Sequence, residues 1–155
     1  MIPVTVAEAA RRFGDRIAYV SEHDWSVTYA DIDRISDEVA AGLAREGVRE
    51  GDVVALVLPP GIEYLLAYCG AAKIGAITAG VNNRLSERER TAVLEVAQPK
   101  LVIDDVNAVT GLRVAGATPP PLAEDPERPV AIIFTSGTTG PVSYTHLTLP
   151  TILRV

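Results

Sequence analysis

The apolar residues of this chain fall into short continuous runs that are separated by segments with helical spacing. The first run, Val53–Leu58, has six apolar residues in succession, which is typical of a parallel strand that is covered on both faces. Further strand-like runs stand at 76–81, 100–104 and 129–134. The segments at 62–74 and 86–97 are predicted helices. This alternation predicts an α/β fold with a largely parallel sheet and flanking helices.

In the amino-terminal third, the sequence predicts a short helix at 6–13 and a β-hairpin with strands at 17–20 and 25–29. Thr28 and Asp31 then have the spacing of a capping box, and the apolar residues after them step by three or four. Gly47 is a natural residue for the end of this helix. We therefore expect a hairpin followed by a long amphipathic helix.

Residues 105–129 are rich in proline and glycine and are predicted to form a linker, with at most a short strand at 112–114. Gly111 and Gly116 have the glycine spacing of a P-loop, but the Lys-Ser/Thr pair that should follow is absent and no buried strand leads into them. We interpret these glycines as part of the linker.

The last strand-like run leads directly into the segment Thr135-Ser136-Gly137-Thr138-Thr139-Gly140. Its hydroxyl and backbone N–H groups can donate hydrogen bonds, and its glycines allow a ligand to approach the backbone closely. In open α/β sheets, ligands bind beyond the carboxyl ends of the strands. The segment therefore predicts a phosphate-binding loop, and the alternative is a flexible polar turn.

This hexamer matches the first half of T-S-G-T-T-G-x-P-K-G, the hallmark of the adenylate-forming superfamily, which the chain resembles from Val6 to Gly140. That superfamily includes AMP-dependent acyl-CoA synthetases, peptide-synthetase adenylation domains and firefly-type luciferases. Five upstream segments resemble its motifs in the same order: Asp15-Arg16-Ile17-Ala18, Thr28-Tyr29-Ala30-Asp31-Ile32, Gly47–Ala55, Ala72–Ala76 and Asn82–Ser86.

The resemblance implies the first part of a large N-terminal AMP-binding (adenylation) domain, of the acyl-CoA synthetase type. It also implies a reaction in two steps, in which a carboxylate attacks the α-phosphate of ATP and a thiol then takes the acyl group from the acyl-adenylate. The thiol is commonly that of coenzyme A, with a carrier protein as the alternative. The resemblance assigns the β- and γ-phosphates to the loop Thr135, Ser136, Gly137, Thr138, Thr139 and Gly140, and Mg²⁺ would share that charge. No residue of this chain is expected to be catalytic or to ligate a metal.

The chain departs from the family pattern after Gly140. Ser143 stands where the motif has its lysine, and the later motifs of the family, which include the ribose-binding Asp and the catalytic Lys, are missing. Residues from about Val142 resemble a translated sequencing adapter. We therefore expect 1–140 to be a truncated adenylation domain, inactive by itself, and 141–155 to be a non-native tail. A divergent native strand is the alternative.

The composition excludes several other classes of protein. Fourteen Lys and Arg residues against twenty Asp and Glu give a net charge of −6, which argues against a nucleic-acid binder with a broad basic face. Cys69 is the single cysteine, so no internal disulfide can form and a reducing compartment is expected. No apolar run approaches the ~20 residues of a membrane-spanning helix. We expect a cytoplasmic protein, whose oligomeric state the sequence does not specify.

A few chemically reactive side chains lie outside the loop. Cys69 is on the inward face of a predicted helix and is interpreted as a core residue. Lys73 follows on the same helix and is predicted to extend along the surface. For Arg84, in a polar segment before a helix, a structural role and a site role are equally favoured. His23 and Trp25 fall in the predicted hairpin and are interpreted as solvated and packing residues respectively.

Two other hypotheses stay open beside the ligase fragment. The first is a stand-alone nucleotide- or phosphate-binding α/β module, which would unfold at a higher temperature in the presence of ATP. A parallel sheet cut after this strand would expose an edge that later strands should cover, which argues against such a module. The second is a truncated product without function, which would aggregate or be sensitive to proteases.

Overall fold

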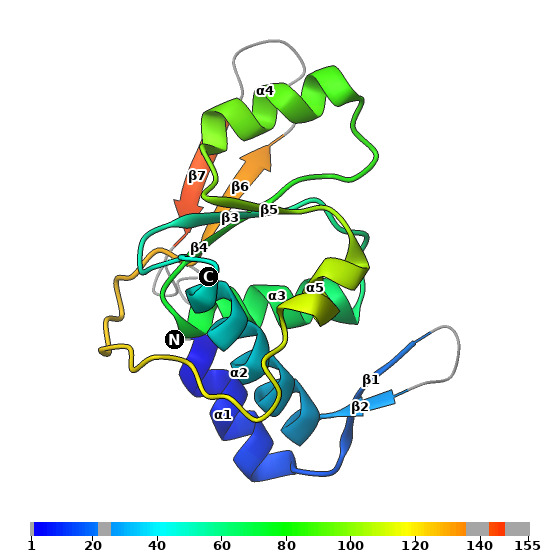
Figure 1. Ribbon diagram of the computed structural model, residues 1–155, viewed down its shortest axis with the longest axis vertical. Coiled ribbons are helices and arrows are strands. Elements are labelled where there is room, and N and C mark those ends of the chain that lie inside the picture. Colours follow the sequence, from blue (N-terminus) through cyan, green and yellow to red (C-terminus); the bar gives the residue numbers. More distant parts are fainter. Residues whose placement is uncertain (1, 22–25, 136–142, 148–155) are drawn as a thin grey trace, which may run out of the picture.

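The computed structural model describes residues 2–21, 26–135 and 143–147, and it has helices on both faces of one central sheet (Figure 1). The elements in chain order are α1 (Ile2–Phe13), β1 (Ile17–Val20), β2 (Ser26–Thr28), α2 (Tyr29–Arg45), β3 (Val53–Leu56), α3 (Ile62–Lys73), β4 (Ile77–Gly80), α4 (Glu87–Ala97), β5 (Leu101–Ile103), α5 (Val106–Leu112), β6 (Ala131–Thr135) and β7 (Ser143–Leu147). Every predicted helix and strand before residue 105 is present, and α1 begins earlier than predicted.

The central sheet has the strand order β5-β3-β4-β6-β7. The first four of these strands are parallel, and β7 runs antiparallel to β6. β1 and β2 form a separate antiparallel hairpin. His23 of the predicted turn and Trp25 of the predicted second strand lie outside the described residues. The structure therefore confirms the α/β class with a largely parallel sheet, flanking helices and an N-terminal hairpin.

The two faces of the sheet are covered unequally. Helices α1, α2, α3 and α5 lie on one face, and α4 lies on the other (Figure 1). Along β3 and the residue after it, Val54 and Leu56 belong to the core under the four helices, whereas Ala55 and Val57 belong to the core on the side of α4. A strand that is buried on both faces needs apolar residues at every position, which explains the continuous run.

Both capping boxes expected from the sequence are present. The Thr28 Oγ1 atom accepts a hydrogen bond from the Asp31 backbone N at 3.0 Å, and the Asp31 carboxylate accepts one from the Thr28 backbone N at 3.3 Å. Ser86 and Glu89 make the same reciprocal bonds at the start of α4. Each box satisfies backbone donors that a helix leaves open, so these residues fix where α2 and α4 begin.

Two glycines let α2 and α3 approach their neighbours closely. A Cβ atom on Gly42 of α2 would lie 1.7 Å from the Leu112 carbonyl oxygen of α5. A Cβ atom on Gly70 of α3 would lie 2.8 Å from a Val39 side-chain carbon of α2. The spacing of the helical layer therefore depends on the absence of a side chain at both positions.

The prediction of an irregular linker from residue 105 onward is wrong at its start, because Val106–Leu112 forms helix α5. The Asp105 carboxylate caps this helix by accepting a hydrogen bond from the Asn107 backbone N at 2.9 Å. Val109 is buried against the core under the four helices. Burial against α2 and α3 stabilises a helix that is too short and too rich in β-branched residues to be evident from its sequence.

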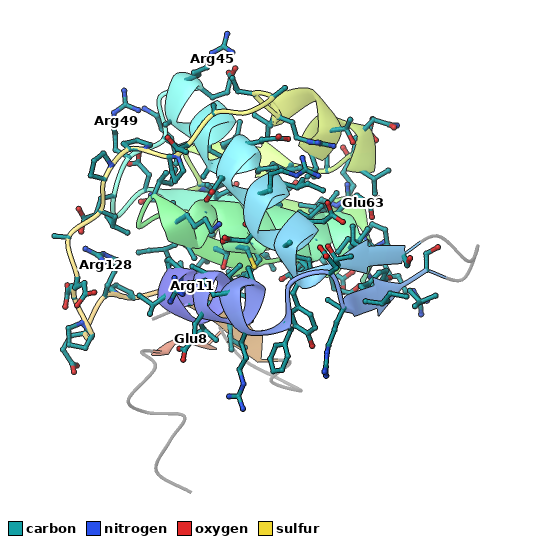
Figure 2. All side chains as sticks on the ribbon, turned by 90° about the horizontal axis from the view of Figure 1, so that it is seen from below. Glu8, Arg11, Arg45, Arg49, Glu63 and Arg128 are labelled. Atoms are coloured by element: carbon teal, nitrogen blue, oxygen red, sulfur yellow. The ribbon has the colours of Figure 1, made fainter. Side chains whose placement is uncertain are left out.

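Residues 113–130 follow α5 and contain no helix or strand. This 113–130 segment runs along the helical layer and returns to the sheet at β6 (Figures 1 and 2). Glu38 of α2 holds its start by accepting hydrogen bonds from the Arg113 side chain and the Gly116 backbone N. An ion pair between Arg128 and Glu50 holds its end. The segment thus has fixed ends although it has no regular structure.

Candidate functional site

The predicted phosphate-binding segment begins at the carboxyl end of β6. Thr135 is the last residue of that strand, whereas Ser136, Gly137, Thr138, Thr139 and Gly140 lie outside the described residues. The four parallel strands place their carboxyl ends at the same edge of the sheet. Thr135 therefore stands at the edge where an open α/β sheet binds ligands. The phosphate-binding role of the loop stays a prediction.

A cavity of about 570 Å³ opens at this same edge, beyond the ends of β3 and β4. Its lining combines apolar and polar residues: Leu58, Pro60, Tyr64, Gly80, Val81, Asn82, Asn83 and Arg84. β4 is the direct neighbour of β6 in the sheet, so the cavity and the end of β6 follow adjacent strands. The sequence offered no direct signal for this cavity, because its lining comes from three separate stretches of the chain.

The shape of the cavity depends on Gly80 and Tyr64. A Cβ atom on Gly80 would lie 2.7 Å from the Tyr64 hydroxyl oxygen, so a larger residue there would force this side chain to shift. Burial raises the pKa of Tyr64 further above neutral pH, so its hydroxyl is protonated under physiological conditions. Asn82 accepts a hydrogen bond from the Arg84 backbone N at 2.9 Å and so shapes the loop that carries Arg84. The exposed guanidinium of Arg84 is the cationic group in the lining, which favours the site role for this residue.

The prediction that Lys73 extends along the surface is wrong. Lys73 is 6% exposed, and its ammonium donates to one carboxylate oxygen each of Asp33 and Asp37 at 2.6 Å. It also donates to the Asp33 backbone carbonyl at 2.8 Å. A lysine with three oxygen acceptors at the α2–α3 interface has no donor left for a ligand, so its role is structural.

Neither lysine of the chain lies at the carboxyl edge of the sheet. Lys73 ends α3, which runs back from that edge to the start of β4. Lys100 precedes β5, and its backbone N donates to the Val53 carbonyl at the start of β3. Both residues therefore lie toward the amino edge, so neither stands in for the lysine that the family motif has after Gly140.

Cys69 and Glu38 also have structural roles, the first as predicted and the second not foreseen from the sequence. Cys69 is buried in the core as predicted, and burial raises the pKa of its thiol to about 11. A thiol with that pKa stays protonated and is a poor nucleophile. Glu38, which the sequence did not single out, is buried on α2 between Arg34 and Arg113. Burial alone would raise the pKa of Glu38, but the hydrogen bonds from Arg113 and the Gly116 backbone N lower it overall.

Within residues 2–21, 26–135 and 143–147, no group of three or more His, Cys, Asp or Glu residues could hold a metal ion. No helix in these same ranges is both long enough and apolar enough to cross a bilayer.

Comparison with known proteins places the chain in a family. A family model described as AMP-binding enzyme matches residues 6–142. The long-chain-fatty-acid–CoA ligase FadD13 of Mycobacterium tuberculosis is 31% identical over 150 residues, covering 79% of this chain and 30% of that protein. The 4-coumarate–CoA ligase CCL1 of Humulus lupulus is 33% identical over 145 residues, covering 74% of this chain and 26% of that protein.

The fold also matches a solved structure. The inhibitor-bound N-terminal domain of FACL13 from Mycobacterium tuberculosis superposes with a TM-score of 0.85 at 26% identity, over 95% of this chain and 44% of that chain. The chain spans 21–33% of the length of the first curated relatives that it matches. The family model covers most of the chain, and its match includes β6 and the residues that follow it. The chain therefore belongs to the AMP-binding enzyme family.

Proposed function

We propose that the full-length protein is an ATP-dependent ligase that activates a small-molecule carboxylic acid and transfers it to a thiol. In the first step the carboxylate oxygen attacks the α-phosphorus of ATP, and the bond to pyrophosphate breaks. In the second step a thiol attacks the carbonyl of the acyl-adenylate, and AMP leaves as the thioester forms. The observation that carries this proposal is the end of β6 at the carboxyl edge of a parallel sheet, directly before Ser136-Gly137-Thr138-Thr139-Gly140.

The proposed task of the loop Thr135–Gly140 is to bind the β- and γ-phosphates. These phosphates become the pyrophosphate leaving group, so negative charge accumulates on them as the reaction proceeds. Hydroxyl and backbone N–H donors that surround them stabilise that charge without a bulky side chain in the way. Mg²⁺ bound to the phosphate oxygens would supply further charge neutralisation.

The acceptor that we propose is coenzyme A. The two named relatives are CoA ligases, one for long-chain fatty acids and one for 4-coumarate, which supports a CoA thioester as the product and a role in the metabolism of fatty or related acids. The lone, buried Cys69 is consistent with a cytoplasmic protein. The relatives differ in the acid that they activate, so the acid of this protein is left to experiment.

We also propose that residues 1–140 are the beginning of the adenylation domain and that 141–155 are a non-native tail. The family match ends at residue 142, which supports this boundary. The pairing of β7 with β6 is compatible with it, because the open edge of a strand can pair with an alternating segment of any origin. Sequencing the intact gene past codon 140 tests the boundary. An x-Pro-Lys-Gly continuation would support it, and the present sequence would contradict it.

The activity itself is tested by ATP–pyrophosphate exchange with the full-length protein and a panel of aliphatic and aromatic carboxylic acids. We expect exchange that depends on one class of acid, and thioester formation when coenzyme A is added. The 155-residue chain, assayed in parallel, should show no exchange above background. No exchange with any acid would contradict the proposed ligase, and exchange by the 155-residue chain would contradict its inactivity.

The same samples separate the ligase fragment from a stand-alone nucleotide-binding module. A module would unfold cooperatively, and its Tm would rise when ATP is added. A fragment that depends on the rest of its domain would show no such rise.

A further inference from the structure

Little in the local chain fixes the position of β6 along the sheet. The strand follows the 113–130 segment, which has no helix or strand. Within the described residues, its parallel pairing with β4 consists of Thr78 with Ala131 and Ala79 with Ile132. β7 pairs with all five residues of β6, but it belongs to the proposed non-native tail. In the native protein the strand therefore needs another determinant of its register.

The hydrophobic pattern of β6 supplies only part of that determinant. A strand usually keeps its register because a slip of one residue would exchange its buried and exposed side chains. In β6 such a slip would exchange Ile132, which is 7% exposed, for Ile133, which is 44% exposed. The two isoleucines are identical, so within this pattern it is Phe134, which packs against the core on the side of α4, that opposes the slip.

Thr78 makes a contact that does discriminate. Its backbone N and its hydroxyl both donate to the carbonyl oxygen of Val130, each at 3.0 Å. Thr78 is 1% exposed and lies in β4 between Ile77 and Ala79, where a valine of equal volume would fit an apolar strand better. Its hydroxyl therefore has a specific use, which is to hold the residue immediately before β6.

Arg128 makes a second such contact two residues earlier. Its side chain is 8% exposed, and its Nε and Nη2 atoms donate to the Glu50 carboxylate at 3.0 and 2.8 Å. The pair packs against the turn before β4, where a Cβ atom on Gly75 would lie 3.0 Å from Glu50 and 3.3 Å from Arg128. Figure 2 shows Arg128 near the end of the 113–130 segment, where that segment passes to the sheet.

We propose that Thr78 and the Arg128–Glu50 pair are positioning residues for the phosphate-binding loop, acting through the register of β6. Both contacts lie at the amino edge of the sheet, and the loop begins about 16 Å further along the strand. A slip of one residue would move the loop by about 3.3 Å, which is more than phosphate-binding donors tolerate. This inference rests on the proposed function, since it assumes that the loop binds ATP.

The test compares Thr78→Val with Thr78→Ser in the full-length protein, by pyrophosphate exchange and by hydrogen–deuterium exchange of the 131–135 amides. Thr78→Val should raise the KM for ATP about fivefold and leave the KM for the carboxylic acid unchanged. The reason is that it removes the hydrogen bond from the Thr78 hydroxyl to the Val130 carbonyl, which helps to hold β6 in register. The β6 amides should exchange faster. Thr78→Ser keeps the hydroxyl and should restore both values. Glu50→Gln, at a half-exposed position that tolerates change, should raise the KM for ATP in the same direction.

Ile103→Val is the matched control, because it removes one methylene from β5, which β3 and β4 separate from β6. It should leave the KM for ATP and the exchange of β6 unchanged. Unchanged β6 exchange in Thr78→Val would overturn the role in register. Faster β6 exchange with an unchanged KM for ATP would overturn the link to the loop. An inactive wild-type protein would instead contradict the proposed function, and the hydrogen exchange would still decide the role of Thr78 in register.

Discussion

The buried charged groups of the helical layer are paired, whereas the charged groups at the carboxyl edge of the sheet are open to solvent. In the helical layer, the buried charges of Lys73 and Glu38 are each held by several partners. At the carboxyl edge, Arg84 is exposed, and its guanidinium has no ion pair within the described residues. Tyr64 and Arg84 both line the cavity there. The difference separates polar groups that hold the fold together from those that are available to a ligand.

The physical reason for the difference is the cost of removing a charge from water. A buried charge is tolerated only when other groups satisfy its hydrogen bonds, so it has no free capacity for a substrate. A charge at an open edge keeps its water shell and can exchange that shell for a ligand. Substitutions in the two regions should therefore change different measurements.

The largest expected effect is that of Lys73→Met. Removing the ammonium leaves Asp33 and Asp37 close together without their shared cation, and we expect a loss of about 4 kcal/mol in the free energy of unfolding. Urea denaturation of the chain measures it. Lys100→Met is the matched control, because Lys100 is the other lysine and its side chain is exposed. Equal losses in the free energy of unfolding for the two substitutions would contradict the distinction between buried and exposed charges.

A smaller effect is expected at the contact between α2 and α5. Gly42→Ala would place a methyl group against the Leu112 carbonyl, and we expect a loss of about 3 kcal/mol in the free energy of unfolding. Gly111→Ala, in the exposed part of α5 where nothing lies within 4 Å, should instead stabilise the chain by up to about 1 kcal/mol. Thermal denaturation of both variants checks the sign. A neutral Gly42→Ala would show that α5 is not packed on α2 as described.

The smallest effect is the pH dependence that Glu38 contributes. The native state lowers the pKa of Glu38, so this carboxylate stabilises the fold above its unfolded pKa of about 4.5 and loses that contribution as the pH falls through the native pKa. Glu38→Gln should cost about 1–2 kcal/mol at pH 7. Its stability should then fall less steeply than that of the wild type below pH 4.5, as urea titrations at pH 3–7 would show. Parallel pH profiles would contradict the role given to Glu38.

Much of the fold could be predicted because its determinants are local in sequence. The apolar run of β3 and the capping boxes at Thr28 and Ser86 each act over a few residues. Helix α5 and the burial of Lys73 could not be predicted in the same way. Lys73 meets Asp33 and Asp37 across 40 and 36 residues, and Glu38 meets Arg113 across 75. Such contacts depend on how whole helices pack.

The candidate site likewise has one part that is local in sequence and one part that depends on how the strands pack. The loop Thr135–Gly140 could be proposed from its own residues, because glycines and hydroxyls after a buried strand are a compact pattern, and its role stays a prediction. The cavity with Tyr64 and Arg84 could not, since it exists only where β3 and β4 lie side by side and Gly80 leaves room for the ring. The anchoring of β6 by Thr78 likewise required the sheet order.

The most direct test of the account is the KM for ATP of the full-length protein with Thr139→Ala, measured beside Glu38→Gln. The loop substitution should raise the KM for ATP about tenfold, because it removes a hydrogen bond to a charged phosphate, and should leave the Tm unchanged. Glu38→Gln should lower the Tm and leave the KM for ATP unchanged. A normal KM for ATP in Thr139→Ala would contradict the account, and so would an equal rise in Glu38→Gln.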